Sequence, residues 1–207
     1  MKGKRNFEAM QEHTRTPCEI GQYFFYGIGT KKNYKRAFPY LLEGAKAGDA
    51  HCQNLVGYCY DLGLGVKTDY RLAAHWYARA AEHKHREALC NLALLYEQGK
   101  GVKLDHKKAF SLYKTAAELG DLWAQCNLGI AYLNGSGTKQ NLTEAIRWIR
   151  KAARNGDAKS QYNLGISYLE GEGVPKNLRY ARLWLNKAAE QGYRKATTAL
   201  SFIQVRR

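Results

Sequence analysis

The sequence predicts an all-α solenoid of about five antiparallel helix pairs, closed at its C-terminal end by a capping helix. Three observations predict this fold. A short pattern, clearest at residues 128–138, recurs around the anchor positions 21, 57, 93, 129 and 165, a fixed step of 36 residues without insertion or deletion. A Gly-x-Gly motif follows every anchor, and small and large apolar residues alternate at helical spacing between the copies. A period of this length is typical of stacked helical hairpins, each packed on its neighbours.

The first helix of each repeat, the A helix, is expected from about eight residues before the anchor to about five after it. Aspartate can satisfy the free amides at its start, and glycine accepts the left-handed conformation at its end. In the first repeat, Thr16-Pro17-Cys18-Glu19 predicts a capping box and a start near residue 17. The other expected caps are Asp49, Asp121 and Asp157, and the expected ends are Gly27, Gly63, Gly99, Gly135 and Gly171.

The second helix, the B helix, is expected to begin twelve residues after the anchor, at Asp69, Asp105, Asn141 and Asn177. Tryptophans recur at one place on it, which predicts that Trp76, Trp148 and Trp184 belong to the core. Glycines at 48, 120, 156 and 192 are expected to end it. Lys84 occupies this place in the second repeat, so its turn is expected to be strained or reshaped.

These boundaries predict one solenoid domain over residues 16–203. Its repeats are expected at about 16–48, 49–84, 85–120, 121–156 and 157–192, with a cap at 193–203 whose helix spans about 195–203. Residues 1–15 lack the repeat pattern and are expected to form a flexible leader or a short amphipathic helix, and residues 204–207 a tail.

Compartment and redox state are also predicted. No signal-peptide pattern and no apolar stretch long enough to span a membrane is visible, which favours a cytoplasmic protein. The cysteines show no paired spacing, and Cys90 and Cys126 occupy equivalent positions on stacked helices, where Cα atoms lie too far apart for a disulfide. Free thiols in a reducing compartment are therefore expected for all five, Cys18, Cys52, Cys59, Cys90 and Cys126.

The pattern Ala-x-x-Gln-Tyr-Asn-Leu-Gly-x-x-Tyr-x-x-Gly-x-Gly-Val, followed by x-x-Ala-x-x-Trp-x-x-x-Ala-Ala-x-x-Gly, resembles the Sel-like repeat family, a branch of the tetratricopeptide superfamily. It is clearest at residues 158–192, and the resemblance covers residues 16–203. The resemblance implies a right-handed superhelix with the A helices along its concave side, and an adaptor or assembly role. It does not imply an enzyme: the cysteine pairs within each repeat that mark penicillin-binding relatives are absent, and no catalytic motif appears.

A partner is expected in the concave groove. Positions three before and one after the anchor should line it, with six before and five after extending the row, and these residues vary between repeats while core positions do not. The predicted partner-binding residues are Tyr26, His51, Asn54, Tyr58, Glu87, Cys90, Leu94, Trp123, Cys126, Ile130, Lys159, Tyr162 and Ile166. Trp123 and its apolar neighbours resemble a binding hot spot; alternatively, they pack between adjacent A helices.

Three recurrent asparagines, Asn91, Asn127 and Asn163, lie two residues before their anchors. They could clamp the backbone of a bound peptide, or else bond the neighbouring helix. No metal or cofactor is predicted. His51, Cys52 and Cys59 share one helix and His83-Lys84-His85 one turn, but neither has the paired spacing of a structural zinc site.

The charge completes the functional prediction. With 33 Lys and Arg against 18 Asp and Glu, the formal net charge is +15, which favours a protein partner with an acidic surface or segment. The predicted function is that of a monomeric, non-enzymatic interaction scaffold. The alternatives are an immunity or inhibitor protein that occludes a cognate toxin or enzyme, and binding of anionic lipid or nucleic acid by the basic convex face. Nucleic acid is the less favoured ligand because no recognition motif is present.

Overall fold

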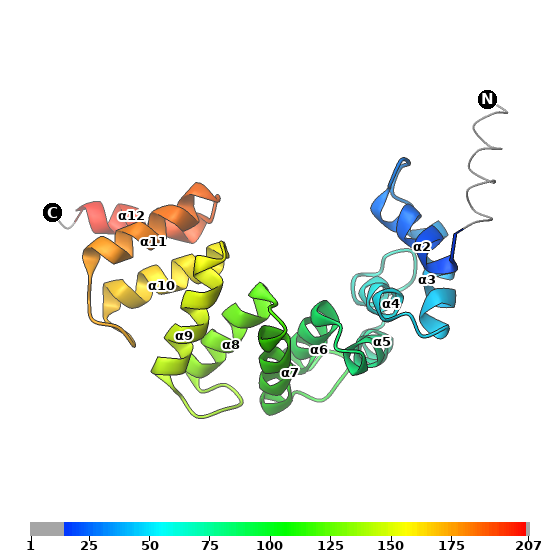
Figure 1. Ribbon diagram of the computed structural model, residues 1–207, viewed down its shortest axis with the longest axis horizontal. Helices are drawn as coiled ribbons and strands as arrows, with labels where there is room; N and C mark the ends of the chain where they lie inside the picture. The colour runs from blue at the N-terminus through cyan, green and yellow to red at the C-terminus, as the bar shows by residue number, and fades with distance from the viewer. Residues whose placement is uncertain (1–14, 206–207) are drawn as a thin grey trace. The chain divides into compact units, whose positions relative to one another are not determined.

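The computed structural model describes residues 15–205, and the predictions for the leader up to residue 14 and for residues 206–207 lie outside this range. Within it, the chain forms eleven helices and no strand (Figure 1). They are α2 (Pro17–Tyr26), α3 (Tyr34–Lys46), α4 (Ala50–Leu62), α5 (Tyr70–Glu82), α6 (Arg86–Gln98), α7 (His106–Glu118), α8 (Leu122–Asn134), α9 (Leu142–Arg154), α10 (Ala158–Glu170), α11 (Leu178–Glu190) and α12 (Arg194–Val205). The even-numbered helices from α2 to α10 are the A helices, and the odd-numbered helices from α3 to α11 are the B helices.

Local sequence chemistry accounts for the ends of these helices. Thr16 and Glu19 form the predicted capping box, with the Glu19 amide donating to Thr16 Oγ1 at 3.3 Å and the Thr16 amide donating to Glu19 Oε2 at 2.7 Å. Aspartate or asparagine caps α4, α5 and α7 to α11, as expected. Each A helix ends at a glycine in the left-handed region, and α12 covers the predicted C-terminal segment. The predicted all-α solenoid of helix pairs is therefore confirmed.

Contacts within the chain divide it into two compact units, here called the N-terminal unit (up to Leu104) and the C-terminal unit (from Asp105). In the N-terminal unit, each of the helices α2 to α5 packs on the helix that follows it. In the C-terminal unit, consecutive helices from α7 to α12 do the same. Each unit is thus a stack of helical hairpins with its own core.

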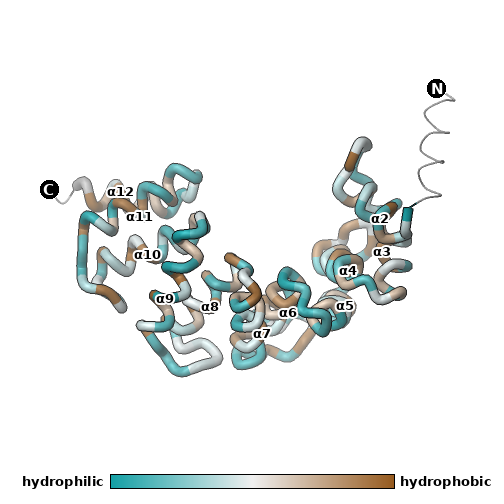
Figure 2. Tube along the Cα trace, viewed as in Figure 1, coloured by the Kyte–Doolittle hydropathy of each residue, from teal (hydrophilic) through white to brown (hydrophobic). Residues whose placement is uncertain are grey.

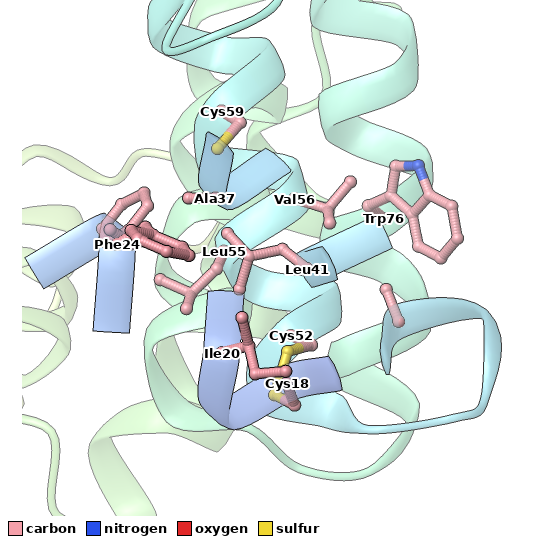
Figure 3. Close-up of a cluster of buried hydrophobic side chains, with 12 residues drawn as sticks. Cys18, Ile20, Phe24, Ala37, Leu41, Cys52, Leu55, Val56, Cys59 and Trp76 are labelled. Atoms are coloured by element: carbon pink, nitrogen blue, oxygen red, sulfur yellow. A yellow bond between two sulfur atoms is a disulfide. The ribbon is translucent and has the colours of Figure 1, made fainter. Parts of the chain in front are cut away.

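The N-terminal core gathers around α2, α3 and α4. Figure 3 shows Ile20, Phe24, Leu41 and Leu55 in this cluster, with Trp76 from α5 at its edge. In the C-terminal unit, smaller clusters form around Ile149 and Leu185. Partly buried aromatic side chains pack against each cluster. Apolar and polar residues interchange along every helix (Figure 2), because each helix turns one side to a neighbour and one to solvent.

In the second to fifth repeats, the second glycine of the Gly-x-Gly motif contacts the preceding repeat. A β-carbon on Gly101 would lie 2.6 Å from the Arg71 backbone nitrogen, and still closer to the Tyr70 carbonyl, at the start of the preceding B helix. Gly101 also has a φ of 67°, a left-handed conformation that side chains disfavour. The loops that follow α4, α6 and α8 therefore rest on the backbone of the preceding repeat through a contact that only glycine permits.

The Lys84 turn keeps the hydrogen bonds of its glycine counterparts, but its φ is smaller than theirs, which range from 80° to 100°. Lys84 has a φ of 56°, and its amide donates to the Ala81 carbonyl at 2.9 Å. In the equivalent turn, the Gly120 amide donates to the Ala117 carbonyl at 3.1 Å. A lysine therefore holds a left-handed conformation that costs a residue with a β-carbon about 1–2 kcal/mol.

Glycine at position 84 is expected to stabilise the protein by about 1 kcal/mol, because relief of the left-handed strain exceeds the extra unfolded-state entropy of glycine. Denaturant unfolding of Lys84→Gly beside the wild type measures this change. The reverse change, Gly120→Lys, is expected to destabilise by a similar amount. A Lys84→Gly variant no more stable than the wild type would contradict the assignment of strain.

The prediction of five free thiols is wrong for two of them. Cys18 in α2 and Cys52 in α4 form a disulfide, with their Cα atoms 6.0 Å apart (Figure 3). Cys18 lies three residues before its anchor and Cys52 five before, so the comparison of equivalent positions did not apply to this pair. The remaining three, Cys59, Cys90 and Cys126, are not part of a disulfide and are buried. The inference of a reducing compartment rested on five free thiols and is therefore no longer supported.

Candidate functional site

Three predicted partner-binding residues meet in the N-terminal unit, one from each successive A helix. The Tyr26 hydroxyl from α2 lies 3.4 Å from His51 Nε2 on α4. His51 Nδ1 lies 3.3 Å from Nε2 of His85, the residue that precedes α6, and His85 Nδ1 lies 3.4 Å from Glu87 Oε2. These four residues, here called the histidine cluster, connect three repeats through their side chains.

The histidines are placed by the helix starts. His51 is the second residue of α4, after the Asp49 cap. His85 is itself the cap of α6, and its Nδ1 accepts the Ala88 amide at 3.4 Å. His85 was not predicted as a cap, although it stands eight residues before its anchor, the place that aspartate takes in three other repeats.

Burial shifts the pKa of two members of this cluster, His85 and Tyr26. It lowers the pKa of His85, and the neighbouring Glu87 carboxylate only partly opposes this effect. Burial likewise raises the pKa of Tyr26, with a further contribution from Glu87. The His85 imidazole is therefore neutral at neutral pH and keeps a lone pair on one nitrogen.

Aromatic side chains are exposed along the predicted row in both units. The exposed fraction is 44% for Tyr26 and 38% for Tyr58 in the N-terminal unit, and 37% for Trp123 in the C-terminal unit. Glu87 is also exposed, and the half-buried members of the row are His51, Leu94, Ile130, Lys159, Tyr162 and Ile166. Exposed aromatic side chains of this size are the usual anchors of protein interfaces.

Three predicted lining residues are buried instead. The exposed fraction is 7% for Asn54, 3% for Cys90 and none for Cys126. Their shared place, three residues before the anchor, is enclosed by neighbouring helices, so the expectation of exposure was wrong for them. Burial raises the pKa of the Cys126 thiol to about 11 and that of Cys59 to about 12, which leaves both thiols unreactive at neutral pH.

The recurrent asparagines bond the neighbouring A helix, the second of the two interpretations. Asn91 Nδ2 donates to Asn54 Oδ1 at 3.3 Å, and Asn127 Oδ1 accepts from Lys159 Nζ at 3.0 Å. Asn163 Nδ2 lies 3.9 Å from the Cys126 sulfur. These side chains hold adjacent A helices together, and a peptide clamp would have to displace those bonds.

A second set of amides was overlooked. A buried glutamine four residues before the anchor donates from Nε2 to a carbonyl near the end of the preceding B helix, at 3.2 Å in each case. The pairs are Gln53 with Ala45, Gln125 with Ala117, and Gln161 with Ala153. The third repeat has Leu89 at this place and lacks the bond. The recurrence of glutamine at one repeat position was the clue available in the sequence.

An apolar groove lies between α10 and α12 in the C-terminal unit. It encloses about 360 Å³ and is lined by Tyr162, Ile166, Leu169, Lys195, Thr198, Ala199 and Phe202. Two of these lining residues, Tyr162 and Ile166, belong to the predicted row, and Phe202 is 68% exposed. Tyr162 also packs against Tyr193, with ring centroids 5.3 Å apart. The predicted row and the capping helix thus share one surface.

Basic side chains gather on the B helix α9. Arg147, Arg150, Lys151 and Arg154 line a cleft of about 660 Å³ together with other α9 residues and with the loop that follows α10. Glu144 pairs with Arg147 at 3.3 Å, and Lys151 lies over the Trp148 ring. Among the described residues, no helix combines the length and apolar character that crossing a bilayer requires.

Repeated helix pairs with an exposed aromatic row define a solenoid repeat protein. The model of the Sel1 repeat matches residues 18–49, 50–85, 86–121, 124–157 and 158–193, and the chain belongs to the Sel1 repeat family. Proteins of this family generally bind other proteins and are generally not enzymes.

Solved structures agree with this membership. A Sel1 repeat protein from Oxalobacter formigenes is 31% identical, with a TM-score of 0.85 over 90% of this chain and 74% of that one. The protective antigen c5321 of uropathogenic Escherichia coli is also 31% identical, with a TM-score of 0.84 over 94% of this chain but 42% of its own length. Immunity protein Pa5087 of Pseudomonas aeruginosa shares the fold at 20% identity, with a TM-score of 0.54 over 81% of this chain and 62% of that one. No curated protein matched the chain.

Proposed function

We propose that the chain is a non-enzymatic interaction scaffold that binds a partner protein or peptide through the exposed side chains of its A helices. The observation that carries the proposal is the exposure of Tyr26, Tyr58 and Trp123 on the predicted row. Large aromatic side chains lose little conformational entropy on binding and bury much apolar area. Preformed helices reduce the ordering cost of association further.

The charge supports an acidic partner. The formal net charge is +15, and a positive field raises the association rate with a negatively charged protein. In the C-terminal unit, Lys159 lies on the same row as Tyr162 and Ile166, which flank the apolar groove. A segment that carries both apolar and acidic side chains would complement this surface.

Alanine in place of Trp123 is expected to weaken partner binding by at least about tenfold, because truncation of an interface hot spot costs about 2 kcal/mol or more. The partner is first identified by pull-down from source cells as a stoichiometric protein and then purified for titration. The matched control is Tyr180→Ala, which removes an aromatic side chain that is 48% exposed on the B helix α11.

Substitution of Trp123 is a better single test than substitution of Tyr162. Tyr162 packs against Tyr193, so its removal would also perturb the capping helix. Trp123 itself meets the Tyr113 ring, with centroids 5.6 Å apart, so thermal unfolding of the variant is measured in parallel. Unchanged affinity in a folded Trp123→Ala protein, or an equal loss in Tyr180→Ala, would refute binding through the A-helix row.

The second candidate function is that of an immunity or inhibitor protein. The identity of the captured protein distinguishes it from a general interaction scaffold. An immunity or inhibitor protein would capture one toxin or enzyme and abolish its activity at equimolar ratio. The similarity to immunity protein Pa5087 is one of fold alone, and it supports this candidate only to that extent. Capture of anionic lipid or nucleic acid instead, lost steeply with added salt, would place function on the basic face around Arg147 and Arg150.

A further inference from the structure

We propose that His51, His85 and Glu87 form a binding site for a divalent transition-metal ion such as Zn²⁺. One ligand atom from each of these side chains lies within 4.8 Å of the other two. Two imidazoles and a carboxylate are a ligand set that suits zinc and its neighbours, whereas Mg²⁺ and Ca²⁺ prefer oxygen ligands alone. The proposal is independent of partner binding.

The geometry of the two rings fits a shared ion. His51 Nδ1 and His85 Nε2 lie 3.3 Å apart. Two nitrogens bound at about 2.0–2.1 Å to a tetrahedral zinc ion are themselves about 3.4 Å apart. The two nitrogens therefore already lie at the separation that the ion requires.

The surrounding groups orient these ligands. When His51 binds the ion through Nδ1, its Nε2 carries the hydrogen and donates to the Tyr26 hydroxyl, 3.4 Å away. A hydrogen bond of this kind from the distal nitrogen is typical of metal-bound histidine, because it fixes the ring and its tautomer. Tyr26 is thus a positioning residue, supplied by a third helix.

Metal binding shifts one hydrogen from one nitrogen of the His85 ring to the other. Without metal, one of the two facing nitrogens must carry a hydrogen for them to bond at 3.3 Å. With metal on Nε2, this hydrogen moves to Nδ1, which then no longer accepts the Ala88 amide. To bind the ion, the exposed Glu87 side chain turns from Nδ1 toward the Nε2 side of the ring, and water can complete the coordination because the cluster is only partly buried.

Sequence reasoning predicted no metal because it considered only neighbouring residues. His51 and His85 are 34 positions apart in the chain, and stacking of the second and third repeats brings them together. The paired spacing of a zinc finger is therefore absent, and the ligands come from successive helix starts instead.

The test is titration of the purified full chain with Zn²⁺ in competition with a chromogenic chelator. We expect one ion per chain, and a loss of affinity on the order of 100-fold or more in His51→Gln/His85→Asn, since loss of even an outer partner costs about 10–100-fold. Asparagine at position 85 retains an N-cap for α6. Glu87→Gln is expected to weaken binding by about tenfold or more, and it changes an exposed side chain that folding does not require.

The matched control is His75→Gln/His106→Gln, which removes two exposed histidines from other helices and is expected to bind as the wild type does. Zn²⁺ should raise the thermal midpoint of the wild type but not that of the double histidine variant. Equal affinity in the wild type and in both cluster variants would overturn the proposal. So would a thiolate-to-metal charge-transfer band with Co²⁺, which would assign the ion to cysteine.

Discussion

Alanine in place of Gly101 is expected to lower the free energy of unfolding by about 2–5 kcal/mol, the sum of left-handed backbone strain and a steric conflict. The new β-carbon would lie 2.6 Å from the Arg71 backbone nitrogen, where no side chain can turn aside. Chemical denaturation followed by circular dichroism measures the loss. It tests the contact that joins one repeat to the next.

Gly29 provides the matched control, because it occupies the same place in the first repeat. Its φ of 71° resembles that of Gly101, but the nearest atoms to an added β-carbon belong to the Tyr23 ring, 3.9 Å away. Gly29→Ala should therefore cost only the conformational part, about 1–2 kcal/mol. Equal destabilisation by the two substitutions would show that close packing on the preceding repeat contributes nothing.

Reduction of the Cys18–Cys52 disulfide is expected to cost about 3–4 kcal/mol of stability, the loop-closure entropy of a crosslink across a sequence separation of 34 residues. Denaturant unfolding with and without a reducing agent measures this loss. A Cys18→Ala/Cys52→Ala variant should unfold at the lower denaturant concentration under both conditions.

Thiol counting provides an independent check of that bond. Before reduction, the denatured chain should expose only the thiols of Cys59, Cys90 and Cys126, and after reduction all five. Five reactive thiols in the unreduced protein would contradict the disulfide. A stability unaffected by reductant in a protein with three thiols would show that the crosslink does not constrain the unfolded chain.

Much of the fold was accessible from the sequence because its determinants are local. A capping box such as that of Thr16 and Glu19 satisfies amides within one helical turn, so the start of α2 follows from a few residues. The fixed step between anchors then transfers each boundary to the next repeat. The turn at Lys84 was expected to be strained or reshaped, because glycine occupies this place in the other repeats.

The candidate site was less predictable because it depends on contacts between repeats. Cys90 and Cys126 were placed on the exposed row from single-helix geometry, but an A helix is enclosed by its own B helix and by adjacent A helices. The disulfide joins cysteines with different offsets from their anchors, and the histidine cluster joins residues of three repeats. Such pairings require the offset and packing of neighbouring helices, which periodicity alone does not supply.

The glycine contact between repeats has an evolutionary consequence. Gly65 rests on the backbone at Tyr34, Gly101 at Tyr70 and Gly137 at His106, always 31 residues earlier in the chain. Because the contact belongs to the repeat and not to one position, duplication or loss of a whole repeat regenerates the same junction. Such chains can lengthen or shorten in steps of one helix pair. Each step adds or removes the exposed side chains that one A helix contributes to the row, while the remaining junctions stay intact.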